Sequence, residues 1–343
     1  LADLRSGQGL SSVVVTVDDI MDEFNNGVYN PHAIRAFVAA AYAAWPVPPR
    51  FLVLAGAGTY DYRDLRGYGG NLVPPLLATT PLGLYSTDDL HADLAGNDGI
   101  PELAVGRIPA LTAAELAAYV AKLAQYEAAP AADAVILLAD AHAAGSGADF
   151  TAQIIDLARQ LDRTQSVAGL SLDEFELEQL RVQLHGHLAD GAAAVTYVGH
   201  GSQEQLAGGN KAWILHLDDL PYLPGPATVY VGLTCLMNRF ELPTGDDLGS
   251  SLVLAPQGGA TAVWSTSSPQ YHWMAASLGQ RFFRIIGEDG VSIGEAVRRA
   301  KTEAAHIDNR PATLHTFILV GDPAMRVNVA PAADDPPAPG EDE

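Results

Sequence analysis

Apolar residues along this chain gather in short runs, and stretches with the helical spacing of apolar and polar positions separate most of these runs. The runs lack the alternation of apolar and polar residues that a strand with one solvent-exposed face shows. They are therefore typical of strands buried on both sides. We predict such strands at 11–17, 51–56, 104–109, 134–139, 192–198, 227–233, 259–264 and 317–320.

Helical patterns fill much of the sequence between these runs, at 32–45, 112–127, 149–161, 177–188, 271–286 and 292–305. Two helix starts carry specific signals. Pro31 suits a first helical turn, and Thr112 with Glu115 three residues later forms a capping box. Strands that alternate with helices imply parallel βαβ units. The sequence therefore predicts an α/β fold, with a mostly parallel sheet flanked by helices.

The order of these elements suggests two side-by-side halves and a tail. A Gly/Pro-rich stretch at 58–101 is long for a loop, and loops of that length are usually functional or hold ions. Pro130 marks a boundary, so we expect an N-terminal α/β subdomain at 1–129 and a second α/β subdomain at 130–330. Residues 331–343 are rich in Pro, Ala, Asp and Glu, which predicts a disordered acidic tail.

Charge and hydropathy narrow the range of partners. The formal net charge is -22, and such a surface repels phosphate backbones, so we do not expect nucleic-acid binding. No apolar run approaches the roughly 18 residues that a membrane span needs. The sequence opens with Leu inside a region that already resembles folded protein, and it has no signal peptide. We therefore expect a segment of a longer protein that carries flanking domains.

The single cysteine, Cys235, excludes a disulfide within the chain and a Cys-rich zinc site. Cys235 ends the predicted strand 227–233, and His200 ends the strand 192–198. Ligands of open α/β sheets bind at the carboxyl ends of the strands. If the two strands are neighbours, the thiol and the imidazole lie a few ångströms apart at one edge of the sheet.

This pairing suits nucleophilic catalysis. A thiol with a pKa of about 8.5 is largely protonated at neutral pH, and a nearby imidazole can lower that pKa and then protonate a leaving amine. The backbone N–H groups of Gly201 and Cys235 are the expected oxyanion donors. Taken singly, a buried cysteine is more often inert core, and a histidine between glycines is more often a turn residue. Their joint occurrence at two strand ends favours a Cys–His dyad.

Several segments resemble the gingipain family of cysteine peptidases, which belongs to the same broad clan as the caspases and legumains. The resemblance extends over about residues 11–329. It is carried by Tyr197-Val198-Gly199-His200-Gly201-Ser202, by Thr234-Cys235 with Phe240, by Ser86-Thr87-Asp88, by 96–98, by 101–107 and by Gly321-Asp322-Pro323.

The resemblance implies a caspase-like fold and a secreted or cell-surface endopeptidase that cleaves proteins or peptides and needs no cofactor for catalysis. It also implies roles for particular residues. Asp140 matches an acidic residue that helps to orient the histidine. Asp149 falls near the S1 aspartate of arginine-specific members, although a helix cap is the interpretation that we favour for it. Tyr271, with Trp273 close by, is in the place of an aromatic residue that closes the pocket; either could instead be core.

Structural calcium is a further expectation from the resemblance. The acidic residues Asp88, Asp89 and Asp98 lie in the long loop, and hard oxygen ligands at close spacing suit calcium. The spacing is not that of an EF-hand, and the alternative is a solvated acidic loop.

Other functions remain open at this point. The family includes sortase-like transpeptidases, and an inactive homologue could serve as a binding or scaffold domain. Arg239, four residues after Cys235, is a departure from well-known members and argues against a basic P1 residue. A serine esterase would require Ser292, in Gly290-Val291-Ser292-Ile293-Gly294, to lie on a nucleophile elbow; a helix cap there is the better interpretation. For His185 and His187 we prefer a turn to a metal site.

Overall fold

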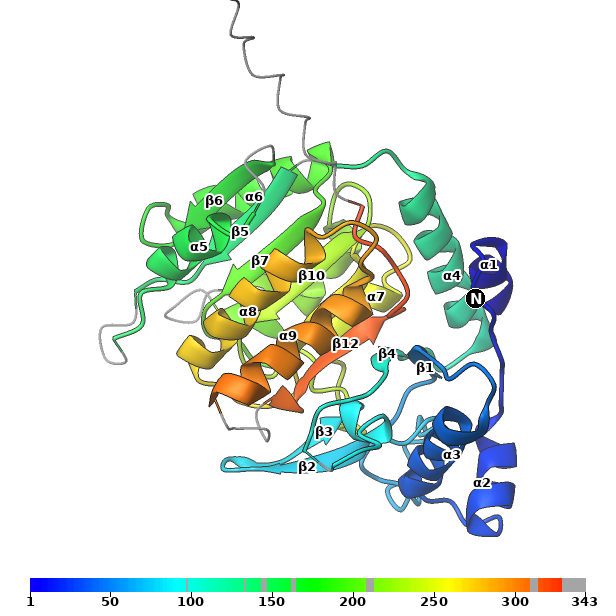
Figure 1. Ribbon diagram of the computed structural model, residues 1–343. Helices are drawn as coiled ribbons and strands as arrows, with labels where there is room; N and C mark the ends of the chain where they lie inside the picture. Colours follow the sequence, from blue (N-terminus) through cyan, green and yellow to red (C-terminus); the bar gives the residue numbers. More distant parts are fainter. Residues whose placement is uncertain are drawn as a thin grey trace, which may run out of the picture.

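The computed structural model of this chain describes residues 1–96, 98–132, 134–142, 147–161, 165–207, 213–308 and 314–328. Its centre is a sheet whose strands, in spatial order within these residues, are β1-β4-β12-β11-β10-β7-β5-β6 (Figure 1). Their bounds are β1 Phe51–Ala55, β4 Ala104–Ile108, β5 Ala134–Ala139, β6 Ser166–Ser171, β7 Ala194–Val198, β10 Thr228–Leu233, β11 Ala260–Thr266 and β12 Phe317–Gly321. The predicted α/β architecture is confirmed.

The sheet is parallel except at one seam, where β12 runs antiparallel to β11. The strands β1, β4 and β12 therefore point opposite to β11, β10, β7, β5 and β6. As a result, β12 from the end of the chain completes the half of the sheet that begins with β1. The carboxyl ends of β5, β7, β10 and β11 open together at one edge.

Helices flank this sheet. The helices α8 and α9 lie side by side across the front of the sheet in Figure 1, and α8 also contacts α5. On α4, the Lys122 ammonium joins this helix to α7 by donating to the carbonyls of Val253 and Ala255. The helix bounds are α1 Ala2–Gly7, α2 Val17–Asn25, α3 Pro31–Ala44, α4 Ala113–Ala128, α5 Phe150–Ala158, α6 Leu177–Asp190, α7 Leu248–Leu254, α8 His272–Ile286 and α9 Ile293–Asp308.

Buried apolar side chains form two clusters. The smaller one draws only on residues between Ile20 and Val105. The larger one extends from Ile108 to Met325 and includes the buried face of α4, which carries Tyr119 and Leu123. The predicted boundary after residue 129 stays a prediction, but the packing assigns α4 to the core of the second half.

The predicted strand at 11–17 is wrong. Val13 and Val14 are 66% and 81% exposed, and α2 begins at Val17 with the Thr16 hydroxyl as its N-cap. Within the described residues β1 pairs with β4 alone, so this β-branched run has no ladder partner. A strand preference without a partner leaves the backbone extended.

Some elements were not expected from the sequence. They are the helices α1, α2 and α7, the strand β6, the hairpin of β2 (Leu76–Thr80) and β3 (Gly83–Thr87), the hairpin of β8 (Gln205–Ala207) and β9 (Trp213–His216), and the short 3-10 helices Asp89–His91 and Leu217–Tyr222. The predicted disordered tail at 331–343 lies outside the described residues. In the part of the chain that the structure describes, no helix is long and apolar enough to cross a membrane.

Candidate active site

Three neighbouring strands end in register at the open edge of the sheet. Ala139 of β5 pairs with Val198 of β7, and Val198 pairs with Leu233 of β10. Asp140, Gly199-His200 and Thr234-Cys235 follow these three residues directly. The parallel pairing thus brings the predicted base and nucleophile to adjacent strand ends, with Asp140 on the other side of the histidine strand.

The backbone of His200 is fixed on both of its polar groups. Its N–H donates to the Asp140 carboxylate at 3.1 Å, and its carbonyl accepts from the Tyr197 hydroxyl at 2.6 Å. A side chain at Gly199 would place its Cβ 2.4 Å from both Asp140 Cβ and Tyr197 Oη, so only glycine fits there. The imidazole itself is exposed, and its ring meets the edge of Phe150, with ring centroids 5.4 Å apart.

Asp140 is buried, and its carboxylate accepts from the backbone N–H groups of His200 and Ala141. Burial raises the pKa of Asp140, and these hydrogen bonds oppose the rise. Asp140 thus holds the main chain from which the imidazole projects, and its orienting role stays a prediction.

Cys235 lies on a sharp turn that leaves β10. The next residue, Leu236, adopts a left-handed φ of 61°, which is unusual for a residue with a Cβ. Backbone hydrogen bonds hold the turn, from Leu236 N–H to the Ser268 carbonyl at 3.2 Å and from Asn238 N–H to the Thr266 carbonyl at 3.0 Å. The turn keeps the half-buried thiol at the sheet edge instead of continuing the strand.

The thiol sulfur has one backbone donor beside it. Gln270 N–H donates to Cys235 Sγ at 3.3 Å, and the Gln270 carbonyl lies 3.8 Å from Sγ. Burial raises the pKa of the Cys235 thiol, and the hydrogen bond with Gln270 opposes the rise. A base is therefore needed to produce the thiolate at neutral pH.

The predicted oxyanion donors are available. Within the described part of the chain, the backbone N–H groups of Gly201 and Cys235 donate no hydrogen bond. A Cβ at Gly201 would lie 2.3 Å from Thr234 Oγ1 and 3.1 Å from the Cys235 carbonyl oxygen. The absence of a side chain at Gly201 thus lets the histidine loop approach the cysteine loop closely.

Comparisons with known proteins identify the family of this chain and its fold. The family model Peptidase family C25 matches residues 1–328. The chain belongs to peptidase family C25. No curated protein matches it. Two similar solved structures are the complex of Porphyromonas gingivalis RgpB pro- and mature domains, with a TM-score of 0.78, and the Arg-specific cysteine proteinase gingipain R (RgpB), with a TM-score of 0.77.

Each of these two structures is 16% identical to this C25 chain; they cover 95% of it and 75% and 74% of their own chains. A third, named only as a protease, is also 16% identical, covers 88% of this chain and 70% of its own, and has a TM-score of 0.70. The fold is therefore gingipain-like, and family membership supports cysteine peptidase activity in general.

Two predicted substrate residues of this C25 chain follow Gln270, the residue whose backbone N–H contacts the thiol. These residues, Tyr271 and Trp273, are 45% and 44% exposed, and their rings stack at 6.2 Å. The alternative that they are core residues is wrong. Asp149 is the N-cap of α5 and accepts from Ala152 N–H at 2.8 Å, so the favoured interpretation as a cap is confirmed. It directly precedes Phe150, which contacts His200.

The three acidic residues predicted to bind calcium are not brought together. Asp88 forms a buried, bidentate ion pair with Arg107, with both N–O distances at 2.7 Å. Asp89 pairs with the buried ammonium of Lys301, and Asp98 accepts from Ile100 N–H at 3.0 Å. In the described residues no group of three His, Cys, Asp or Glu side chains could hold a metal ion. This set does not fit calcium, because internal cations already neutralise Asp88 and Asp89.

The remaining sequence alternatives are resolved by local structure. Ser292 Oγ accepts from Glu295 N–H at 3.2 Å at the start of α9, so it is a helix cap and the serine-esterase interpretation fails. His185 and His187 lie inside α6, so the predicted turn is wrong. Arg239 Nε lies 3.5 Å from Glu241, and its guanidinium covers the Tyr85 ring at 5.4 Å. Its positive charge is partly compensated.

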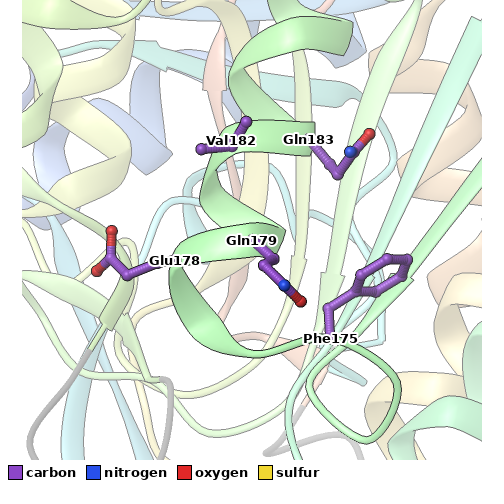
Figure 2. Close-up of a pocket in the computed structure, with 5 residues that line it drawn as sticks. All are labelled: Phe175, Glu178, Gln179, Val182 and Gln183. Atoms are coloured by element: carbon purple, nitrogen blue, oxygen red, sulfur yellow. The ribbon is translucent and has the colours of Figure 1, made fainter.

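A hollow of about 500 Å³ lies beside α6. Figure 2 shows its lining, which consists of Phe175, Glu178, Gln179, Val182 and Gln183. None of these residues belongs to the histidine or cysteine loop.

Sequence reasoning missed Phe150 and Gln270, which contact His200 and Cys235 from other elements. Phe150 is the first residue of α5, and nothing in the sequence distinguishes this helix start from others. Gln270 had one weak signal, since it ends a polar run that follows the buried strand β11 at the catalytic edge.

Proposed function

We propose that this C25 chain is a cysteine endopeptidase, with Cys235 as nucleophile and His200 as acid and base. One observation carries the proposal, namely the register that aligns Val198 with Leu233 and so sets the two residues on adjacent strand ends. The proposal is supported further by the strained turn after Cys235 and by the fixed backbone of His200. Proteins or peptides are the proposed substrates, and the chemistry requires no cofactor.

The reaction follows from these groups. The Cys235 thiolate attacks the carbonyl carbon of the scissile bond, and the oxygen that becomes negative is stabilised by the N–H groups of Gly201 and Cys235. The C–N bond then breaks as His200 gives its proton to the leaving amine, and a thioester remains. Water, deprotonated by His200, attacks the thioester and releases the carboxylic acid and the free thiol.

We propose that the substrate side chain before the scissile bond contacts the exposed rings of Tyr271 and Trp273. The carboxylate of Asp149 is exposed and leaves one oxygen beyond its cap hydrogen bond, so it is the group that could pair with a basic P1 residue. Compensation of Arg239 by Glu241 weakens the argument against such a residue. Action outside the cell or at its surface is a further proposal that rests on family membership.

A peptide series with a thiol-reactive group and varied P1 residues tests this function. The native chain, Cys235→Ala, His200→Ala and the control His185→Ala are compared for labelling rate and for cleavage of matched peptides. We expect labelling that Cys235→Ala abolishes, that His200→Ala slows by about 100-fold or more, and that His185→Ala leaves unchanged.

Other outcomes identify the alternatives. If His200→Ala and the native chain react equally slowly, no dyad is assembled and a scaffold role is the better account. If labelling depends on His200 but the acyl group passes to an added amine in preference to water, the chain is a transpeptidase.

A further inference from the structure

The side chain of Gln270 is anchored in a buried cluster of hydroxyl groups. Its Nε2 donates to Thr316 Oγ1 at 2.8 Å, to Ser268 Oγ at 2.9 Å and to Thr266 Oγ1 at 3.3 Å. The three hydroxyl residues are at most 1% exposed. The amide nitrogen shares its two hydrogens among these three fixed oxygens, which holds the side chain in one conformation.

This hydroxyl cluster (Thr266, Ser268 and Thr316) is itself cross-linked. Ser268 Oγ and Thr316 Oγ1 are 2.7 Å apart, and Ser268 N–H donates to Thr266 Oγ1 at 3.0 Å. Thr266 ends β11, and Thr316 immediately precedes β12, so the cluster lies across the antiparallel seam of the sheet. The anchor of Gln270 therefore belongs to the rigid centre of the sheet.

The backbone of the same residue reaches the reactive sulfur. Gln270 N–H lies 3.3 Å from Cys235 Sγ, and Pro269 before it restricts the chain that leads there. A backbone N–H that donates to an anionic sulfur forms a charge-assisted hydrogen bond, which is stronger than the bond to the neutral thiol. The donor therefore favours the thiolate, provided that its position is held.

We propose that Gln270 is a positioning residue of the peptidase, whose side-chain amide holds its own backbone N–H against the Cys235 thiolate. The inference rests on the proposed role of Cys235 as nucleophile. It assigns the stabilisation of the thiolate to two groups that follow different strands, the imidazole of His200 after β7 and the N–H of Gln270 after β11. The substrate contacts of Tyr271 are built on the same anchored segment.

The single cysteine permits a direct test, because any alkylation by iodoacetamide of the native chain reports Cys235. The rate is measured against pH for the native chain and for Gln270→Met, which keeps the length of the side chain but removes its hydrogen bonds. Gln179→Met, on the exposed face of α6 (Figure 2), is the matched control. We expect the midpoint of the curve of alkylation rate against pH to lie at higher pH for Gln270→Met than for the native chain. At pH values below the midpoint, the variant should hold about threefold to tenfold less thiolate.

A second pair of variants keeps the test independent of how well Gln270→Met folds. Thr316→Val removes the hydroxyl that accepts from Gln270, whereas Thr316→Ser retains it. We expect a raised midpoint for the valine variant and a native midpoint for the serine variant, with kcat reduced and KM unchanged in the former. Equal midpoints for all of these variants would overturn the inference.

The outcome is separable from a failure of the proposed function. If His200→Ala leaves the midpoint and the cleavage rate unchanged, the dyad fails, whatever Gln270 does. If His200→Ala raises the midpoint but Gln270→Met does not, the dyad stands and only the inference about Gln270 falls.

Discussion

The carboxylate of Asp140 accepts a hydrogen bond from the backbone N–H of His200, 3.1 Å away. Because this bond fixes the main chain that carries the imidazole, we expect Asp140→Ala to lower kcat/KM by roughly 10-fold to 100-fold. Asp140→Asn keeps an acceptor oxygen and should lose less. Steady-state cleavage of the preferred peptide measures both, with the exposed Asp156→Ala on α5 as the control.

Close contact between the histidine loop and the cysteine loop gives a second prediction. A Cβ at Gly201 would lie 2.3 Å from Thr234 Oγ1, so Gly201→Ala must push the loops apart and displace an oxyanion donor. We expect kcat/KM to fall by about 100-fold. Thr234→Ala removes the clashing oxygen, and in the double variant it should restore part of the activity. Full activity of Gly201→Ala would show that the N–H of Gly201 is not an oxyanion donor.

Gly186 is the matched control for that substitution. It lies inside α6, and a Cβ there would meet nothing within 4 Å. Gly186→Ala should therefore leave kcat/KM unchanged and raise the free energy of unfolding by about 0.5–1 kcal/mol, because alanine loses less backbone entropy in a helix.

The meeting of Cys235 and His200 could be predicted from the sequence because both residues follow buried apolar runs, and parallel register then sets them at one edge. Contacts that cross between elements could not be predicted in this way. Gln270 contacts the thiol through its backbone N–H. Every residue type except proline has this group, so the residue type at position 270 gives no sign of the contact. Only its side-chain anchor depends on residue identity.

Two predictions that the structure does not support, the strand at 11–17 and the calcium residues, fail for a shared reason. Residues 11–17 have the composition of a strand, and Asp88 and Asp89 have the chemistry of calcium ligands. Composition alone does not show which strand or which charged group each segment will contact. The valine run finds no neighbouring strand in the described part of the sheet, and the two carboxylates find Arg107 and Lys301, which are distant in sequence.

The cap and substrate roles of Asp149 can be separated, since asparagine caps a helix as well as aspartate does. We expect Asp149→Asn to keep the native free energy of unfolding while lowering kcat/KM about tenfold for peptides with Arg or Lys at P1. Peptides with a neutral P1 residue should be cleaved as before. Asp149→Ala should in addition lose about 1 kcal/mol of stability. An equal change for basic and neutral peptides would leave Asp149 as a cap only.

Arg107 neutralises Asp88 inside the protein, and it also donates to the carbonyls of Gly56 and Val73 at 2.7 and 2.8 Å. Arg107→Met would leave a buried carboxylate without a partner. We expect the free energy of unfolding in denaturant to fall by about 3–5 kcal/mol. The double variant Arg107→Met/Asp88→Leu removes both charges and should recover part of that loss. A double variant with a lower free energy of unfolding than Arg107→Met would contradict this account.

The buried N-cap of α7 predicts a pH-dependent stability. Asp247 accepts from Ser250 N–H at 2.9 Å, yet burial, with a smaller contribution from Glu241, raises its pKa from 3.8 to about 7. A raised pKa in the folded state means that Asp247 stabilises the fold at low pH, and that this contribution is lost as pH rises from about 4 through about 7. Asp247→Asn retains the cap without the charge. It should match the native chain near pH 4 and exceed its free energy of unfolding by about 1–3 kcal/mol at pH 8. Denaturant unfolding at both pH values measures the difference, and the exposed Asp190→Asn, which should show none, is the control. A constant difference between the two pH values would mean that Asp247 is ionised throughout.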